Sequence, residues 1–175
     1  LETDRDGLRI YDNPVGVLTN NPAFNMQMFN LNNYMQMSTR PPVNFLAEEL
    51  DLQVYSRGMG ALGLPGDLSS QSRFVRVAFT KMNSVSGDTE SESVSQFFHI
   101  LGSVEQQNGC TFISEPDLYE YTIYTSCYNT ADAVLYYRTY NNSQITAVKL
   151  MSEDLDSCDL IDYKLITDEQ ISFIN

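Results

Sequence analysis

The sequence has few positive charges and no long apolar run. Only 10 of its 175 residues are Lys or Arg, against 23 Asp or Glu, which gives a formal net charge of −13. A phosphate backbone is held by many Lys and Arg side chains, so no nucleic-acid partner is expected. No run of about 18 apolar residues is present, and neither a membrane span nor a membrane partner is predicted.

Cysteine and histidine are also scarce. Cys110, Cys127 and Cys158 are far apart and odd in number, which fits neither a CxxC metal site nor a disulfide framework. Buried thiols in a reducing compartment are the simpler interpretation. His99, the one histidine, follows two phenylalanines on an expected helix, so a packing or surface role is favoured over a general base. The sequence therefore predicts no metal and no cofactor.

The first residues predict a β-hairpin. Asp4-Arg5-Asp6-Gly7 forms an Asp-Gly turn between Leu1–Thr3 and Leu8–Tyr11. A natural start seldom lies inside a hairpin, so we expect a piece of a longer protein. No basic segment followed by an apolar one opens the chain, and no secretory signal is expected.

A strand and a helix are expected next. Val15–Thr19 is a short apolar run that predicts a buried strand. Asn21 and Pro22 have the residue types of a helix cap and first position, and Arg40-Pro41-Pro42 ends the helix. The inward face is expected to consist of Phe24, Met28, Leu31 and Met35.

Two more helices are predicted after an irregular, glycine-rich stretch over residues 50–68. One starts near Ser69, with Asp67 or Ser69 as its cap, and the next runs from about residue 92 to 107. The first should bury Phe74, Val75, Ala78, Phe79 and Met82. The second should bury Val94, Phe97, Phe98, Leu101 and Val104.

The last third is rich in Tyr, Thr, Val and Ile with alternating polar residues, which predicts an antiparallel meander turning at Asn141-Asn142-Ser143. Helices followed by strands indicate an α+β fold, with helices stacked on a largely antiparallel sheet. The composition, 42% hydrophobic and 19% charged, is that of a globular domain with a sizeable core.

The glycines Gly58, Gly60 and Gly63 match G-x-G-x-x-G, the dinucleotide-binding pattern. That pattern needs a strand before it and a helix starting within it. Pro65 and Gly66 interrupt any such helix, so a loop leading to the helix at Ser69 is the favoured interpretation.

Two side chains have two interpretations each. Arg73 lies near the start of a helix, where a cation is mildly disfavoured, and it is either a surface residue, with Asp67 as a candidate partner, or a guanidinium that points into a site. Asn20 lies between the expected strand and the helix start. It is either a turn residue or an amide that, with free backbone N–H groups, stabilises an oxyanion.

Several segments together resemble the bile salt hydrolase (choloylglycine hydrolase) family, which includes penicillin V acylase. They include DNPVGVLTNNPAFNMQMFNLNNY, YSRGMGALGLPGDLSSQSRFVRVAFTKMNS, SVSQFFHILGSVEQQ and YYRTYNNSQITAV. The similarity extends through nearly the whole chain in the same order. It implies that residues 1–175 are the C-terminal portion of a single N-terminal-nucleophile hydrolase domain, a four-layer αββα sandwich with antiparallel sheets.

The resemblance also implies a mechanism. An N-terminal cysteine attacks the amide carbonyl, and its own amino group acts as the base. Asn20, in Thr19-Asn20-Asn21-Pro22, would contribute to the oxyanion hole. Arg73, in Ser72-Arg73-Phe74, would lie near the nucleophile.

The nucleophile belongs to the family's other half, and neither Leu1 nor any of the three cysteines matches it. We therefore expect the N-terminal half of the same enzyme as partner, with conjugated bile salts as substrate. A homo-oligomer, a tetramer by resemblance, and a bacterial cytoplasmic location are also expected. Two alternatives stay open: a penicillin V acylase, or a non-catalytic fragment that acts only by assembly.

Overall fold

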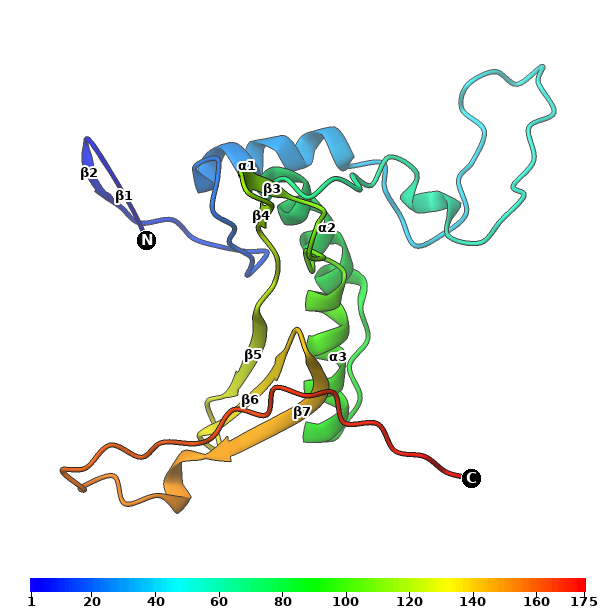
Figure 1. The fold of residues 1–175 in the computed structure, drawn as a ribbon. Helices are drawn as coiled ribbons and strands as arrows, with labels where there is room; N and C mark the ends of the chain where they lie inside the picture. Colours follow the sequence, from blue (N-terminus) through cyan, green and yellow to red (C-terminus); the bar gives the residue numbers. More distant parts are fainter. The chain divides into compact units, whose positions relative to one another are not determined.

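The computed structural model describes residues 1–175, apart from the side chain of Asp4. The chain divides into two compact units, Leu1–Ser84 and Val85–Asn175 (Figure 1). Among the described residues, no helix has the length and apolar character that crossing a membrane requires.

The first unit opens with the expected hairpin. Strands β1 (Glu2–Asp4) and β2 (Gly7–Arg9) pair antiparallel, and Asp4 lies opposite Gly7, so Arg5 and Asp6 form the turn. The helices that follow are α1 (Phe24–Asn30), the 3₁₀ turns η1 (Leu31–Tyr34) and η2 (Met59–Ala61), and α2 (Ser70–Asn83).

Helix α2 forms the core of the first unit. Its cap is Ser69, one of the two expected residues, and the Ser69 hydroxyl accepts a hydrogen bond from the Ser72 amide. Phe74 is 0% exposed, and its ring meets that of Phe24 edge-on with centroids 6.3 Å apart. Met82, expected to point inward, is 62% exposed because the buried face consists of Phe74, Val75, Val77 and Ala78.

The strand expected at Val15–Thr19 is absent, and only Val17 of this run is buried. A strand needs a neighbouring strand for its backbone groups, and β1 and β2 pair with each other. Side-chain donors form hydrogen bonds with backbone carbonyls of this run instead. Asn13 Nδ2 donates to the Val17 oxygen at 2.9 Å, and Lys81 Nζ to the Val15 oxygen at 2.6 Å.

Helix α1 starts later and ends earlier than the sequence predicts. Its cap is Ala23, not Asn21, and the Phe24 amide donates to Glu2 Oε1 at 2.8 Å. After Asn30 the chain tightens into η1, which has about three residues per turn. Met35 is therefore 79% exposed, away from the expected apolar face.

The second unit contains the expected meander. Strands β5 (Tyr124–Asn129), β6 (Val134–Thr139) and β7 (Asn142–Lys149) form an antiparallel sheet in that order. A small hairpin, β3 (Phe112–Ser114) with β4 (Leu118–Tyr119), precedes it, and the turn η3 (Leu150–Ser152) follows.

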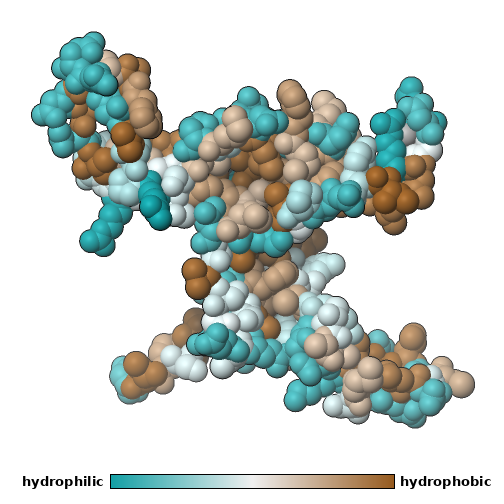
Figure 2. All heavy atoms as spheres, turned by 180° about the vertical axis from the view of Figure 1, so that it is seen from behind, coloured by the Kyte–Doolittle hydropathy of each residue, from teal (hydrophilic) through white to brown (hydrophobic). Residues whose placement is uncertain are grey.

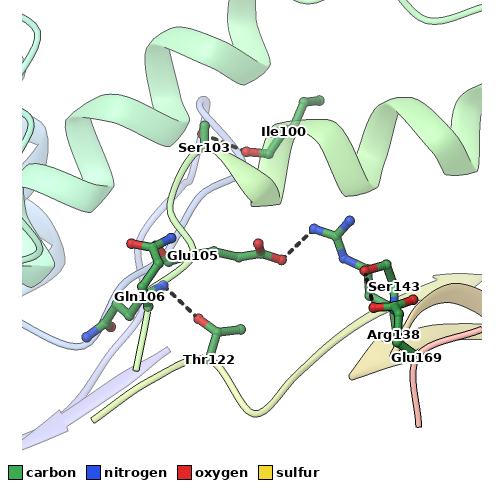
Figure 3. Close-up of polar contacts among 9 residues, drawn as sticks. Ile100, Ser103, Glu105, Gln106, Thr122, Arg138, Ser143 and Glu169 are labelled. Carbon is green, nitrogen blue, oxygen red and sulfur yellow. Dashed lines mark hydrogen bonds and ion pairs between the residues drawn. The ribbon is translucent and has the colours of Figure 1, made fainter. Parts of the chain in front are cut away.

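Helix α3 (Glu90–Gly102) packs on this sheet and buries Val94 and Phe98. It starts two residues before the expected position because Thr89 and Glu92 form a capping box. It ends five residues before the expected position, because the residues that follow bind β6 and the segment that precedes β5 (Figure 3). Glu105 pairs with Arg138, and the Gln106 amide donates to Thr122 Oγ1 at 3.0 Å.

The residues after η3 form no helix or strand. This segment is fastened to the start of β7 by Glu169, whose carboxylate accepts from the Ser143 amide at 3.0 Å and hydroxyl at 2.9 Å (Figure 3). These bonds lower the pKa of the Glu169 carboxyl.

The expectation of buried thiols is wrong for two of the three cysteines. All three are free, but Cys110 lies exposed in the turn after α3, and Cys158 is exposed in the irregular segment after η3. Cys127 is half-buried in β5, and burial raises the pKa of its thiol.

Candidate functional site

The glycine motif is a structural loop. Gly58 precedes the 3₁₀ turn η2, and α2 begins only at Ser70, so no helix starts within the motif. The Gly60 carbonyl accepts from the Ser38 amide at 2.9 Å, and a Cβ at Gly60 would collide with the carbonyl oxygens of Ser38 and Arg40. The glycine is needed for close backbone approach, and the loop interpretation agrees with the structure.

The loop after the glycines is bound to α2 by two side chains. Arg76 Nη1 donates to the carbonyls of Pro65 at 2.8 Å and Asp67 at 3.1 Å. The Asp67 carboxylate accepts from the Ser69 amide and the Ser72 hydroxyl. Hydrogen bonds from Ser69 and then Ser72 lower the pKa of Asp67 to about 2. The first turn of α2 is thus capped by a charged group at ordinary pH.

Arg73 lies half-buried in the second turn of α2. Its Nε donates to the Leu68 carbonyl at 3.1 Å, which holds the guanidinium against the loop. Among the described side chains Arg73 and Asp67 form no ion pair, because Asp67 is occupied by the two serines. The pairing of Arg73 with Asp67 is therefore not formed in the structure.

Asn20 is exposed, and its neighbours on both sides are bound to α2. Thr19 Oγ1 donates to the Ser70 carbonyl at 3.1 Å, and the Asn21 amide donates to Ser70 Oγ at 2.8 Å. Ser70 and Arg73 are three residues apart on one helix, a spacing that places them on the same face. The structure therefore brings the segment that contains Asn20 to the end of α2 that carries Arg73.

Gln27 is part of this arrangement and is not among the residues predicted from the sequence. It is 0% exposed, accepts from Thr19 Oγ1 at 2.6 Å and donates through Nε2 to the Pro22 carbonyl at 2.7 Å. A signal was present, because Gln27 follows Phe24 by three residues and so interrupts the expected apolar face. A polar residue on that face must find buried partners.

An open groove of about 1030 Å³ adjoins this segment. Its lining combines neutral amide and hydroxyl groups with exposed apolar side chains, and contains no charged residue. The lining residues are Asn21, Pro22, Asn25, Met26, Phe29, Asn30, Asn33, Ser69, Ser70 and Gln71. An apolar lining with a few polar groups is typical of a small-molecule site.

The assembled groups are hydrogen-bond donors without a nucleophile. Asn20 offers an exposed amide, and Arg73 a fixed positive charge. His99 is exposed on α3 in the other unit. Among the described residues, no three His, Cys, Asp or Glu side chains gather as metal ligands. An amide donor and a guanidinium are groups that stabilise negative charge.

Comparison with known proteins gives the family context. The model described as "Linear amide C-N hydrolases, choloylglycine hydrolase family" matches residues 1–163. A bile salt hydrolase/transferase of Lactiplantibacillus plantarum is 60% identical over 175 residues, all of this chain and 54% of that protein. One of Clostridium perfringens is 35% identical over 175 residues, all of this chain and 53% of that protein.

Solved structures agree. Crystal structures of a cysteine-to-alanine mutant and an arginine-to-leucine variant of the Clostridium perfringens conjugated bile acid hydrolase match with a TM-score of 0.86 and 35% identity. Each match covers 98% of this chain and 52% of the other. Penicillin V acylase of Agrobacterium tumefaciens matches with a TM-score of 0.55 and 16% identity, over 77% of this chain and 35% of the other, which is a likeness of fold. The chain spans about half the length of the curated relatives it matches.

Proposed function

This chain belongs to the choloylglycine hydrolase family of linear amide C–N hydrolases, and from that membership we propose that it is the C-terminal portion of a conjugated bile salt hydrolase. The enzyme would cleave the amide bond between a bile acid and glycine or taurine. The observation that carries the proposal is the 60% identity, over every residue of this chain, to a bile salt hydrolase/transferase.

The proposed mechanism uses groups from both halves. A cysteine at the N-terminus of the other half attacks the amide carbonyl as a thiolate, after its own amino group has accepted the thiol proton. The amide nitrogen takes up a proton and leaves as glycine or taurine. Water then hydrolyses the thioester and frees the bile acid.

Within this scheme the chain supplies charge stabilisation. Asn20 donates from its side-chain amide to the oxyanion of the tetrahedral intermediate. Arg73 lies near the thiolate and supports its charge and orientation. The hydrogen bonds that join residues 19–21 to Ser70 support this assignment, because they tie Asn20 and Arg73 to one end of α2.

The proposed partners are the missing half of the same domain and further copies of the enzyme in the cytoplasm of a bacterium. An irregular loop between η1 and η2 supports assembly, because it exposes several apolar side chains and exposed apolar patches mark interaction sites. Figure 2 shows hydrophobic surface on this loop, at the upper left. The exposed apolar residues are Val43, Phe45, Leu46, Leu50, Leu52, Val54 and Tyr55.

Two other functions compete with this one. A penicillin V acylase would use the same mechanism on another acyl group, but the likeness to such an enzyme is at 16% identity. A non-catalytic fragment that acts only by assembly would have the same structure and no substrate.

A chimera tests the proposal. The full chain is joined to the remaining half of the Lactiplantibacillus plantarum relative, and the product is assayed with glycocholate, taurocholate and penicillin V. We expect release of glycine or taurine. Activity on penicillin V alone would support the acylase, and a folded chimera inactive on all three would support the non-catalytic fragment.

A further inference from the structure

We infer that Gln27 and Ser70 are positioning residues that fix Asn20 for catalysis, an inference that rests on the proposed function. Asn20 itself is exposed, and no element of regular structure contains it. An exposed amide on an irregular segment samples several orientations unless its neighbours are held. An oxyanion donor gains its effect from being fixed before the charge develops. The backbone around Asn20 therefore needs an external support.

Gln27 provides that support from the buried side. Its Oε1 accepts from Thr19 Oγ1 at 2.6 Å, and its Nε2 donates to the carbonyls of Pro22 at 2.7 Å and Thr19 at 3.4 Å. The two ends of the segment, before and after Asn20, are thus joined through one side chain. A glutamine with no exposed surface is costly to bury unless its bonds are made, so the contact is specific rather than incidental.

Ser70 provides the support from the side of α2. Its carbonyl accepts from Thr19 Oγ1, and its hydroxyl accepts from the Asn21 amide. Ser70 is one turn before Arg73 on the same helix. Ser70 thus sets the position of Asn20 relative to Arg73, because the segment that contains Asn20 binds the helix that carries Arg73.

Thr19 connects the two supports. Its single hydroxyl proton is shared between Gln27 Oε1, 2.6 Å from Thr19 Oγ1, and the Ser70 carbonyl oxygen, 3.1 Å from it. Gln27, Thr19 and Ser70 therefore form one network that holds the residues on either side of Asn20 and leaves its side chain available. We name this network the Asn20 clamp.

The first experiment changes the clamp in the chimera. Gln27→Met keeps the side-chain length but cannot form the bonds to Thr19 and Pro22. We expect kcat to fall about 10- to 100-fold with KM little changed, because misplacement of a donor affects the transition state most. Gln27→Glu keeps the acceptor for Thr19 but places a carboxylate oxygen against the carbonyls of Pro22 and Thr19, so it should not restore activity. Gln36→Met, at an exposed glutamine, is the matched control and should leave kcat unchanged.

A double-mutant cycle tests whether the clamp acts through Asn20. In an Asn20→Ala background, Gln27→Met and Ser70→Ala should cause little further loss of kcat. Full additivity of the losses would overturn the inference. If wild-type chimera lacks bile salt hydrolysis, or Asn20→Ala leaves kcat unchanged, the proposed function or its site fails instead.

A second measurement needs no activity. In the 175-residue chain, Ser70→Ala removes the acceptor for the Asn21 amide, and hydrogen exchange at Asn21 should accelerate about tenfold or more. Ser95→Ala, at an exposed position of α3, is the control and should not change it. Unchanged exchange at Asn21 in Ser70→Ala would show that the clamp does not hold the segment, whatever the enzyme's substrate.

Discussion

The two units differ in the interactions that hold their backbone in place. In Val85–Asn175 a helix packs on a three-stranded meander whose strands are joined by backbone ladders. In Leu1–Ser84 long stretches have no helix or strand, and side chains such as Gln27, Asn13 and Lys81 bind the backbone carbonyls instead. Both candidate catalytic residues lie in this first unit. The comparison teaches that the candidate site lies where polar side chains, rather than a regular ladder, hold the backbone.

The largest expected effects come from the cores. Phe74→Ala and Phe98→Ala each remove a nearly fully buried ring, and each should lower the free energy of unfolding by about 3–5 kcal/mol. Chemical denaturation of the chimera measures both. Only Phe74→Ala should also lower kcat per folded molecule, because Phe74 follows Arg73 on α2. Equal loss of kcat in both variants would remove the functional distinction between the units.

Loss of the proposed oxyanion donor should be next in size. Asn20→Ala in the chimera is expected to lower kcat about 100- to 1,000-fold, since one such donor contributes that much in other acyl-transfer enzymes. Asn108→Ala, at an exposed asparagine of the second unit, is the matched control. Steady-state kinetics with glycocholate gives both values. A loss in Asn20→Ala confined to KM would contradict a role in the transition state.

Changes to the two helix caps should have smaller effects, and they form a better-matched pair of variants. Ser69→Ala and Thr89→Ala remove the N-caps of α2 and α3, and each should cost about 1 kcal/mol in the free energy of unfolding. Ser69→Ala should in addition lower kcat several-fold, because it loosens the turn that carries Ser70. If Thr89→Ala reduced kcat equally, the effect would be one of general stability.

The smallest expected effect is a dependence on pH. The pKa of Asp67 is lowered from 3.8 to about 2 in the folded chain, so its contribution to stability is complete above pH 4 and is lost as the pH falls towards 2. Asp67→Asn should remove this dependence in the chain alone, as followed by NMR signals of α2.

Glu90 of the second unit is the counterpart of Asp67. Hydrogen bonds from Asn129 and then Tyr136 lower the pKa of the Glu90 carboxyl from its ordinary value, so Glu90→Gln should remove a dependence on pH from the NMR signals of α3. A change in α2 signals on Glu90→Gln, or none on Asp67→Asn, would contradict the assignment.

The elements that depend on residues close together in the chain were predicted correctly from the sequence. The hairpin at Asp4–Gly7, the start of α2 at Ser69 and the meander all depend on turn residues, caps and alternation within a few positions. The strand at Val15–Thr19 failed because a strand depends on a partner that local sequence does not reveal.

The candidate site shows the same limit. Asn20 and Arg73 could be selected from helix ends and from the resemblance. The contacts of Ser70 with Thr19 and Asn21 span about 50 positions, and no local pattern predicts such a pairing. Gln27 was detectable as a polar residue on an apolar face, but its partners were not.

The most direct test of the central claim is native mass spectrometry combined with a glycocholate assay. The 175-residue chain alone and the chimera are measured side by side. We predict that the isolated 19.8 kDa chain releases no glycine and that the chimera does. Glycine release by a species with the mass of the intact chain alone would contradict the claim that a second half supplies the nucleophile.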